Sequence, residues 1–293
     1  MKKTIMLLPI LLLASCSLFP NLDLGGMFNG SSPRNDQRFE ESMAYNDSVP
    51  SRYPDLTMPN DEYTIYVGTD FHVDTTWRTT AAFAKEAAAK ADMVLLLGDM
   101  VNAQNNYPHF WEGIRALRES FVPWYATAGN HDIYFGQWSV FKQYFGTSTY
   151  FFTVTTPSAR DLYICLDSSD GTLGVKQLAW LRALLAQKQE EGFRHTIVFT
   201  HTHMFKRDGS QGHTSNYVLE ETYEITSLLS RYGVDWYVSG HDHSREVTEY
   251  KGVKYIIVDA NNDAEPKPGY MMAAVGGTLA YRFGSTDELL KKQ

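Results

Sequence analysis

Short apolar runs of strand length alternate with segments of helix length from about residue 60 onward. The five clearest apolar runs are Thr64–Val67, Met93–Leu97, Trp124–Ala128, Thr196–Phe199 and Val234–Val238. Runs of this length and composition are typical of buried β-strands. The intervening segments predict helices over Thr79–Ala91, Phe110–Ser120, Gly174–Glu191 and Tyr223–Tyr232. This alternation predicts an α/β fold in which the helices cover a sheet.

Each predicted strand runs directly into a turn that carries Asp, Asn or His. In chain order these turn residues are Asp70 and His72, Asp99, Asn130 followed by His131 and Asp132, His201 and His203, and His241 and His243. The carboxyl ends of strands in open α/β sheets line the ligand crevice. Five segments that are distant in the sequence are therefore expected to converge on one site. One such turn is weak evidence, whereas five in order are hard to attribute to chance.

The converging side chains have the chemistry of ligands for divalent transition metals. Imidazole, carboxylate and amide oxygen ligands without a thiolate fit Mn, Fe(II), Zn or Co better than Ca or Cu(I). The candidate ligands are seven: Asp70, His72, Asp99, Asn130, His201, His241 and His243. Seven ligands are too many for one tetrahedral ion, but they suit two ions that share a bridging carboxylate. Two ions about 3.5–4 Å apart can hold a phosphoryl group for in-line displacement and lower the pKa of a bridging water. The competing interpretation is a set of polar loop residues with satisfied hydrogen bonds.

The order of the motifs resembles the signature of the calcineurin-like metallophosphoesterases. The matching motifs are Asp70-x-His72, Gly98-Asp99, Gly129-Asn130-His131-Asp132, His201 and Gly240-His241-x-His243. The resemblance extends from about Tyr63 to the region of Gly252. It implies a sandwich of two β-sheets flanked by helices, a four-layer α-β-β-α architecture, with the metals at the edge of the sheets. It also implies hydrolysis of phosphomonoesters or phosphodiesters by attack of a metal-bound hydroxide.

The resemblance further implies a role for each side chain. It assigns Asp70, His72 and His243 to one metal, Asn130, His201 and His241 to the other, and Asp99 to the bridge between them. His131 is expected to contact the phosphoryl oxygen or protonate the leaving group, with Asp132 orienting its ring. A carboxylate neighbour fixes the tautomer of a histidine and raises its basicity. The alternative for His131 is a structural histidine near the site.

Two positions depart from common family patterns. The purple acid phosphatase branch has a Tyr ligand shortly after the bridging Asp, whereas this chain has Asn102 in the segment after Asp99, so no Fe(III)–tyrosinate colour is expected. Many members have His-His-Pro or a similar run in the fourth motif, whereas this chain has His201-Thr202-His203-Met204. His201 is assigned as the ligand because it comes first after the strand, and His203 is expected to face the substrate or to support a ligand. Asn102 and His109 are further candidates for substrate contact, and their alternatives are a conformational turn residue and an exposed loop histidine.

The first residues resemble an export signal. Lys2 and Lys3 precede the apolar run Ile5–Leu13, which is too short to span a bilayer as a mature helix. The Leu-Ala-Ser-Cys sequence that ends at Cys16 resembles the bacterial lipoprotein cleavage box. This resemblance implies cleavage after Ser15, acylation of Cys16 and a membrane-anchored protein in the bacterial cell envelope. The alternative is ordinary secretion with an incidental cysteine.

The sequence predicts three segments. They are a lipoprotein signal peptide over residues 1–15, the lipidated Cys16 with a spacer over residues 16–60, and a metallophosphoesterase domain over residues 61–288. The spacer is rich in Gly, Pro, Asn, Asp and Ser, which break periodic patterns. Within it, Arg38–Tyr45 is expected to form one or two helical turns that pack on the domain.

Charge and cysteine content narrow the choice of partners. The 293-residue chain has a formal net charge of −8, opposite in sign to a nucleic-acid groove, so a small phosphorylated substrate is expected rather than a nucleic-acid polymer. Bound metals can still dominate the local field at an acidic site. Cys16 and Cys165 are the only cysteines, which excludes a disulfide framework and a cysteine zinc site. Cys165 lies in an apolar run and is expected to be a buried hydrophobe.

Two other functions are compatible with the same motifs. One is a binding lipoprotein with a non-catalytic metal site, which the intact His131–Asp132 pair argues against. The other is a metallohydrolase that cleaves acyl or amide bonds. Turnover of a panel of phosphate and acyl esters by the metal-loaded protein separates these functions from a phosphoesterase.

Overall fold

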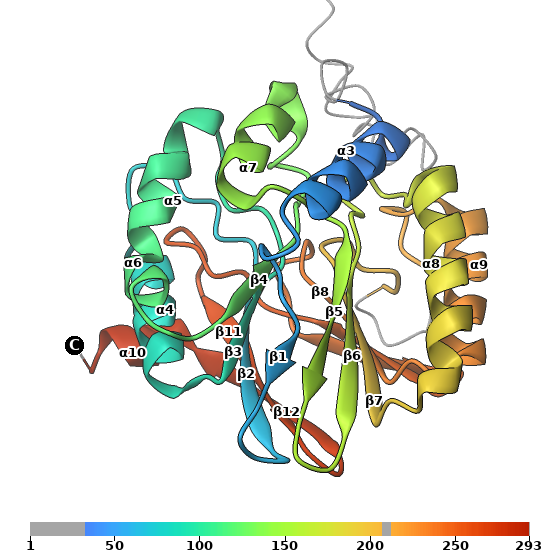
Figure 1. Cartoon of the computed structure of the whole chain (residues 1–293). Coiled ribbons are helices and arrows are strands. Elements are labelled where there is room, and N and C mark those ends of the chain that lie inside the picture. Colours follow the sequence, from blue (N-terminus) through green and yellow to red (C-terminus); the bar gives the residue numbers. More distant parts are fainter. Residues whose placement is uncertain (1–32, 207–211, 293) are drawn as a thin grey trace, which may run out of the picture.

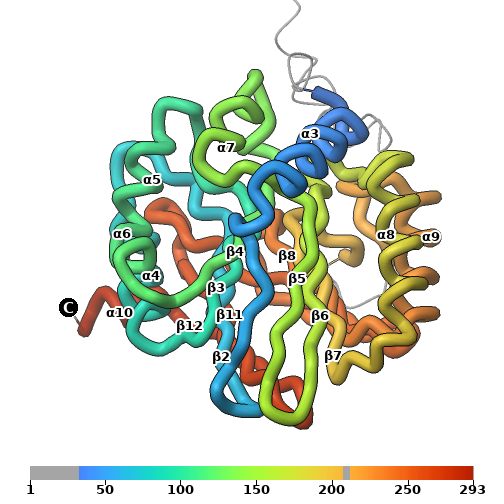
Figure 2. Tube along the Cα trace, in the orientation of Figure 1, coloured from blue at the N-terminus to red at the C-terminus, as the bar shows by residue number. Residues whose placement is uncertain are grey.

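The computed structural model describes residues 33–206 and 212–292, so the predicted signal segment and Cys16 lie outside the described residues. Within them, two β-sheets lie face to face and helices cover the outer face of each sheet (Figure 1). The α/β sandwich flanked by helices that the sequence predicts is therefore confirmed. Figure 2 shows two further helices at one end of the sandwich.

The two sheets are both mixed and differ in size. The larger sheet has the strand order β1 (Leu56–Thr57), β5 (Tyr150–Thr155), β6 (Arg160–Cys165), β7 (His195–Phe199), β8 (Trp236–Ser239), β10 (Val253–Ile257) and β9 (Glu246–Tyr250). Its strands β6, β7, β8 and β10 are parallel. The smaller sheet has the order β12 (Leu279–Ser285), β11 (Gly269–Val275), β2 (Tyr63–Gly68), β3 (Met93–Leu96) and β4 (Trp124–Ala126). Its strands β2, β3 and β4 are parallel, so their carboxyl ends meet at one edge.

The helices form the two outer layers and cover one end. The smaller sheet is covered by α4 (Arg78–Lys90), α5 (Tyr107–Gly113), α6 (Arg115–Arg118) and α10 (Thr286–Leu290), and the larger by α8 (Gly174–Lys188) and α9 (Leu219–Arg231). The end of the sandwich carries α3 (Asn35–Ser48) and α7 (Trp138–Phe145). Short 3₁₀ turns are η1 (Gln104–Asn106), η2 (Tyr134–Gly136) and η3 (Gln189–Glu191). Among the described residues, none of the helices has the length and hydrophobicity needed to cross a bilayer.

Side chains of the parallel strands alternate between two cores. On β2, Ile65 and Val67 face the core between the sheets, whereas Tyr66 faces the helices of the smaller sheet. On β7, Phe199 faces the core between the sheets, whereas Val198 faces α8 and α9. Successive side chains of a strand point to opposite faces. Both faces of these strands are covered, which explains why their sequences are continuous apolar runs rather than alternating ones.

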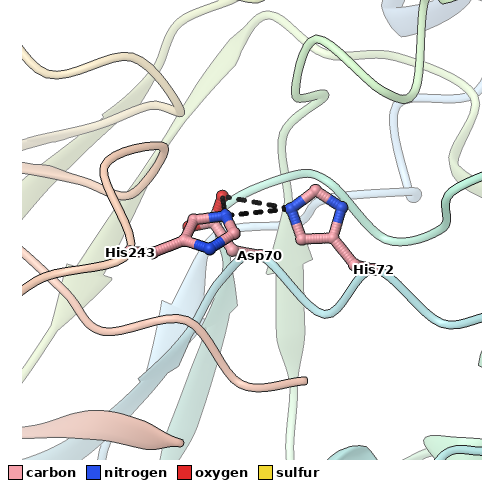
Figure 3. Close-up of side chains that lie close together, drawn as sticks. All are labelled: Asp70, His72 and His243. Carbon is pink, nitrogen blue, oxygen red and sulfur yellow. Dashed lines mark hydrogen bonds and ion pairs between the residues drawn. The ribbon is translucent and has the colours of Figure 1, made fainter. Parts of the chain in front are cut away.

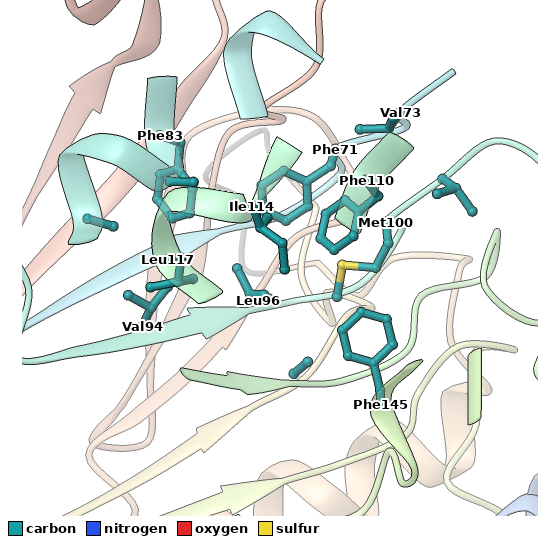
Figure 4. Packing of buried hydrophobic residues seen from close by; sticks show 14 of the residues in the cluster. Phe71, Val73, Phe83, Val94, Leu96, Met100, Phe110, Ile114, Leu117 and Phe145 are labelled. Carbon is teal, nitrogen blue, oxygen red and sulfur yellow. The ribbon is translucent and has the colours of Figure 1, made fainter. Parts of the chain in front are cut away.

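An aromatic core beneath the smaller sheet holds two of the predicted ligand turns. Phe71 and Met100, each directly after a predicted ligand, are buried in the same cluster (Figure 4). The ring of Phe71 packs edge-on against Phe110 of α5 with centroids 5.3 Å apart, and its centroid lies 5.9 Å from that of Phe83 in α4. These apolar contacts fix the turns after β2 and β3, so the polar side chains beside them are held at the surface of the core.

The predicted strands and helices are all present, with differences in extent. The helix predicted from Phe110 begins at Tyr107, because a proline in the first turn is compatible with a helix start, and it is interrupted at Ile114, where ψ is 15°. The helix predicted from Tyr223 begins at Leu219. The sequence pattern does not predict β1, β5, β6, β9, β10, β11, β12, α7 or α10. The exposures of successive β12 residues alternate, as expected of an edge strand with one face toward solvent.

The segment predicted as a spacer is part of the folded body from Asn35 onward. Arg38 of α3 is fully buried, and its Nε and Nη2 lie 2.9 and 3.1 Å from the two carboxylate oxygens of Asp167. Phe39 packs against Trp180 of α8, with ring centroids 6.0 Å apart. The folded body therefore begins well before the predicted domain start at residue 61. A buried arginine has the same sequence signal as a surface one, so its ion pair was not visible in the pattern.

Candidate metal centre and active site

The turns after five strands meet at one end of the sandwich, three from the smaller sheet and two from the larger. Asp99, after β3, lies between the contributions of the two sheets. Its Oδ2 is 3.4 Å from His72 Nε2 on one side and 3.5 Å from His201 Nε2 on the other. The structure therefore brings the five predicted strand ends together, and these strands belong to both sheets of the sandwich.

One cluster joins Asp70 and His72, after β2, with His243, after β8. The two Nε2 atoms of His72 and His243 are 3.0 Å apart, and Asp70 Oδ1 lies 3.5 Å from His243 Nε2 and 3.9 Å from His72 Nε2 (Figure 3). All three side chains can offer one ligand atom to a common point. They are the three residues that the sequence resemblance assigns to one metal.

A second cluster joins Asn130, after β4, with His201 and His241. Asn130 Oδ1 is 3.0 Å from His201 Nε2 and 2.8 Å from His241 Nδ1, and these two ring nitrogens are 3.2 Å apart. His201, Asp70 and Asp99 also lie within reach of a common ion. The two clusters thus contain the seven predicted ligands and share Asp99.

The donor atoms fit a pair of metal ions. Asp70 Oδ1 is buried and accepts no hydrogen bond within the described chain, although Asp70 Oδ2 accepts bonds from Thr69 and from the His241 backbone. An unpaired buried carboxylate oxygen is costly, and a cation at the centre of the cluster satisfies it. The set contains imidazole nitrogens, carboxylates and one amide oxygen but no thiolate, which suits borderline divalent ions.

The backbone at the site is held in an unusual conformation. Seven non-glycine residues of the described chain have positive φ, and five of them are predicted ligands: Asp70 (51°), His72 (43°), Asp99 (51°), His241 (73°) and His243 (53°), alongside Phe135 and Lys251. Left-handed backbone is unfavourable for residues with a Cβ and persists where the surrounding structure imposes it. The concentration of left-handed residues at these turns indicates that the surrounding packing holds the backbone in an unfavourable conformation, which directs the ligand side chains toward the site.

Two glycines allow the turns to approach one another. A Cβ on Gly129 would overlap the carboxylate and backbone of Asp99, and a Cβ on Gly240 would overlap the side chains of Thr69 and Asp70. Each glycine directly precedes a predicted ligand, Asn130 or His241. The absence of a side chain therefore lets the ligand turns come together, within the smaller sheet at Gly129 and between the two sheets at Gly240.

The pKa values of several ionisable groups at the site are shifted strongly, some upward and some downward. Burial opposes ionisation of Asp99, but His201 and its other histidine neighbours outweigh it and hold the pKa of this carboxyl well below its usual range. Burial also opposes protonation of His201, yet Asp99 raises the pKa of this imidazole to about 10. Burial and the nearby His201 lower the pKa of His241 to about 3. Groups that compete in this way for protons release them when a cation binds, so metal affinity depends on pH.

The second nitrogen of each ring fixes its orientation. His72 Nδ1 is 3.1 Å from Asn102 Oδ1, His201 Nδ1 is 2.8 Å from the Leu97 carbonyl oxygen, and His243 Nδ1 is 3.4 Å from Glu265 Oε2. Each of these three histidines therefore presents Nε2 to its cluster, and the acceptor favours a proton on Nδ1. A carbonyl or carboxylate behind a ligating imidazole sets its tautomer and strengthens it as a ligand.

His131 lies beside the two clusters, and its ring comes within ligand reach of a common ion with His72 and Asp99, although it is not one of the seven predicted ligands. Its backbone N–H donates to Asp99 Oδ1 at 2.8 Å, and its ring stands edge-on to that of His72 with centroids 4.6 Å apart. Burial lowers the pKa of its imidazole. The ring lines a cavity together with His72 and His243.

Asp132 does not contact the His131 ring, contrary to the orienting role predicted from the sequence. Its buried carboxylate accepts hydrogen bonds from the Gly129 N–H at 2.8 Å, the Tyr107 hydroxyl at 2.8 Å and the Met100 N–H at 3.2 Å. Within the described residues, no hydrogen bond or ion pair joins it to the neighbouring histidine. Asp132 N bonds to the Gly129 carbonyl in a tight turn, and this turn directs the carboxylate inward, where it ties the loops after β3 and β4 together.

The remaining candidates from the sequence are placed differently. Asn102 bonds to His72 at both its backbone and ring, so it supports a ligand. His203 is buried; its Nε2 lies 3.9 Å from Asp242 Oδ1, and its ring lies 5.6 Å from that of His241, outside the two clusters. His109 lies within α5, where it stacks on Trp77 and its Nδ1 is 2.6 Å from the Asp74 carbonyl oxygen.

Sequence reasoning found His72, Asn102, His131 and His243 but missed the other residues that line the cleft beside them. A cavity of about 560 Å³ opens on His72, His131 and His243 and is walled by the segment after His72 and by the loop after β10. Glu265 comes from that loop and has no motif around it that could have marked it. Asp74 lies two residues beyond His72, and its position next to a ligand motif was the one available signal.

Comparisons with known proteins agree with the site. Residues 63–245 match the calcineurin-like phosphoesterase family. Tartrate-resistant acid phosphatase type 5 of Rattus norvegicus is 28% identical over an aligned length of 238 residues, and the match covers 68% of this chain and 69% of that protein. Purple acid phosphatase of Glycine max is 27% identical over an aligned length of 218 residues, and the match covers 65% of this chain and 46% of that protein.

Solved structures share the fold at lower identity. Purple acid phosphatase PPD1 from yellow lupin seeds superposes with a TM-score of 0.59 at 13% identity, over 79% of this chain and 53% of that one. GAP50, described as the anchor in the inner membrane complex of Plasmodium, superposes with a TM-score of 0.60 at 16% identity, over 78% of this chain and 86% of that one. At these identities the superpositions establish the common architecture of sheets and helices.

Proposed function

The chain belongs to the calcineurin-like phosphoesterase family, and from that premise we propose that it hydrolyses phosphomonoesters or phosphodiesters with two divalent transition metal ions. The observation that carries this proposal is the position of Asp99, whose Oδ2 lies within 3.5 Å of ring nitrogens from both clusters. A carboxylate shared by two groups of ligands is what a bridged pair of ions requires. Mn, Fe, Zn and Co all suit the donor atoms.

We assign the ligands by cluster. Asp70, His72 and His243 would hold one metal, Asn130, His201 and His241 would hold the other, and Asp99, which lies between the two clusters, would serve both. When bound, two such ions supply Lewis acidity for the phosphoryl group and for an attacking water.

The chain's own groups then position the substrate. The ring of His131 lines the cavity that opens on His72 and His243, where an imidazole can donate a proton to a phosphoryl or leaving-group oxygen. Asp132 holds the loop that carries His131 through backbone contacts, and Asn102 orients His72. Asp132 therefore acts as a positioning residue.

The test is turnover and metal content measured on one sample. The purified chain is stripped of metal, reloaded separately with Mn, Fe(II), Zn or Co, and assayed on p-nitrophenyl phosphate, bis-p-nitrophenyl phosphate and p-nitrophenyl acetate. We expect two metals per chain and hydrolysis of a phosphate ester well above that of the metal-free sample. Failure of every metal to support phosphate ester hydrolysis would refute the proposal. Cleavage of the acetate alone would point to an acyl hydrolase.

We also propose that the protein is anchored in the bacterial cell envelope through acylated Cys16. The supporting observation is the order of basic start, apolar run and Leu-Ala-Ser-Cys box in residues 1–16, which precede the described residues. Mass spectrometry of the mature amino terminus tests this: we expect an acylated Cys16, and an unmodified terminus at another residue contradicts it. A Cys16→Ser variant should lose the modification and partition into the aqueous phase.

A further inference from the structure

The cleft beside the metal clusters is lined by acidic side chains. The cavity is lined by three histidines, His72, His131 and His243, which we call its floor. It is also lined by three acidic residues, Asp74, Asp263 and Glu265, which belong to its walls. Within the described part of the chain, no lysine or arginine lines this cavity. Its volume of about 560 Å³ leaves room for a small ester arm beyond a phosphoryl group on the floor.

Two of the three carboxylates, those of Asp263 and Glu265, are held in place by contacts with the chain. Asp263 accepts the backbone N–H groups of Arg78 and Thr79 at 3.0 and 2.8 Å and so caps the start of α4. Glu265 Oε2 lies 3.4 Å from His243 Nδ1. These contacts fix the position of each carboxylate relative to the cleft.

Asp74 carries the least compensated of these charges. The helix start and the imidazole offset part of the charge of the other two carboxylates. Asp74 is exposed, and its Oδ1 accepts a hydrogen bond at 3.0 Å from the neutral amide of Asn106. No lysine or arginine of the described residues forms an ion pair with it. Its charge is therefore available to a group in the cleft.

We propose that this cleft selects phosphate esters whose ester arm carries an ammonium group, that is, phosphate esters of amino alcohols. The inference rests on the proposed function, because it assumes that the phosphoryl group sits on the histidine floor. An arm that extends from there meets the carboxylates of Asp74 and Asp263. An ammonium group gains their attraction and can donate to them, whereas a carboxylate or second phosphate is repelled. The same repulsion disfavours nucleoside polyphosphates and nucleic acids.

The test is a matched series of esters given to the metal-loaded full chain. The monoesters are 2-aminoethyl, propyl and carboxymethyl phosphate, and the diesters are their p-nitrophenyl counterparts, so the arms are similar in size and differ chiefly in charge. We expect kcat/KM to fall in the order ammonium, neutral, carboxylate, with about tenfold between the extremes at low ionic strength. Added salt should narrow this range, because it screens charges in an open cleft.

Substitutions at Asp74 assign the effect to the cleft. Asp74→Asn should reduce the ratio of kcat/KM for the ammonium and carboxylate esters about two- to fivefold, and Asp74→Lys should reverse the preference. Asp47→Asn, on the exposed surface of α3 and outside the cavity, is the matched control and should leave the ratio unchanged. Equal kcat/KM for the ammonium and carboxylate esters in the unmodified protein overturns this inference alone. No turnover of any phosphate ester overturns the proposed function as well.

Discussion

Asn102 Oδ1 lies 3.1 Å from His72 Nδ1, and Asn102 Nδ2 donates to the backbone carbonyl of His72 at 3.1 Å. One side chain therefore fixes both the ring and the backbone of a proposed ligand whose φ is 43°. Asn102 stands in the segment after Asp99 in which the purple acid phosphatase branch places a tyrosine ligand. In this chain the side chain supports the neighbouring imidazole, so the metal set proposed here consists of histidine, carboxylate and amide groups.

Replacing Asn102 should weaken one metal site selectively. In Asn102→Leu the ring of His72 loses the acceptor that fixes its tautomer, and affinity for one of the two metals should fall about 10- to 100-fold. Calorimetric titration of the metal-free protein measures the two sites separately. Asn105→Leu, an exposed residue in η1, is the control and should bind both metals normally. Unchanged affinity at both sites in Asn102→Leu would show that the contact has no effect on the metal.

His131→Ala should separate catalysis from metal binding. The imidazole faces the cavity but is not needed to complete either cluster, so the variant should retain two metals per chain. Its kcat should fall about 10²- to 10⁴-fold if the ring acts on the substrate. Metal analysis and aryl phosphate turnover of the same sample provide the measurement. A variant that keeps its full rate excludes a catalytic role for this histidine.

His201 and His203 should differ in their effect on metal content. His201 Nε2 lies near Asn130, His241 and Asp99, whereas His203 lies outside both clusters. His201→Ala should therefore lose at least one metal per chain, and His203→Ala should keep both. Elemental analysis of the folded fraction, isolated by size-exclusion chromatography, decides between them. Metal loss in His203→Ala with retention in His201→Ala would reverse the assignment.

Metal removal should lower thermal stability. A ligand that binds only the folded state stabilises it by about 2.7 kcal/mol when its free concentration is about 100 times Kd. Removing the ions also leaves Asp70 Oδ1 buried without a donor. We expect a lower Tm in chelator and recovery when Mn is restored, measured by calorimetry. Asp99→Asn, which loses the bridge, should show little metal-dependent shift, and a Tm that is independent of metal in the unmodified protein contradicts a structural contribution from the ions.

The ion pair between Arg38 and Asp167 should make stability fall at low pH. Burial opposes ionisation of Asp167, but Arg38 outweighs it and lowers the pKa of this carboxyl below 3.8. Because the folded state binds the proton less tightly than the unfolded chain, the contribution is complete above pH 3.8 and is lost as pH falls through the lower folded-state pKa. Denaturant unfolding between pH 2 and 6 should show this loss.

Arg38→Met should remove about 3–5 kcal/mol at neutral pH by leaving the carboxylate of Asp167 buried and unpaired. The variant should also lose the part of the acid dependence that comes from this pair. Lys176→Met removes the exposed ion pair between Lys176 of α8 and Glu40 of α3. This substitution should lower the free energy of unfolding by less than about 1 kcal/mol. Equal effects of the two substitutions would show that burial of Arg38 is not what stabilises α3.

Much of the fold could be predicted because its central strands are buried on both faces. Their continuous apolar runs and the polar turns that follow them are local features, so five strands and all seven proposed ligands were visible in the sequence. The edge strand β12 was not, because one of its faces is turned toward solvent. The helical turns predicted over Arg38–Tyr45 are present within α3, but the buried ion pair of Arg38 that holds this helix to the body has no distinctive local pattern.

By itself, the sequence determined which side chains stand at strand ends and what chemistry they offer. The tertiary structure decided what lies behind and around them: Asp132 faces the backbone rather than His131, Glu265 lies behind His243, and Asp74 walls the cleft. The physical reason is that strand periodicity is a property of neighbouring residues in the chain. Contacts between irregular loops, such as the one that brings Glu265 to His243, form only when distant elements pack together.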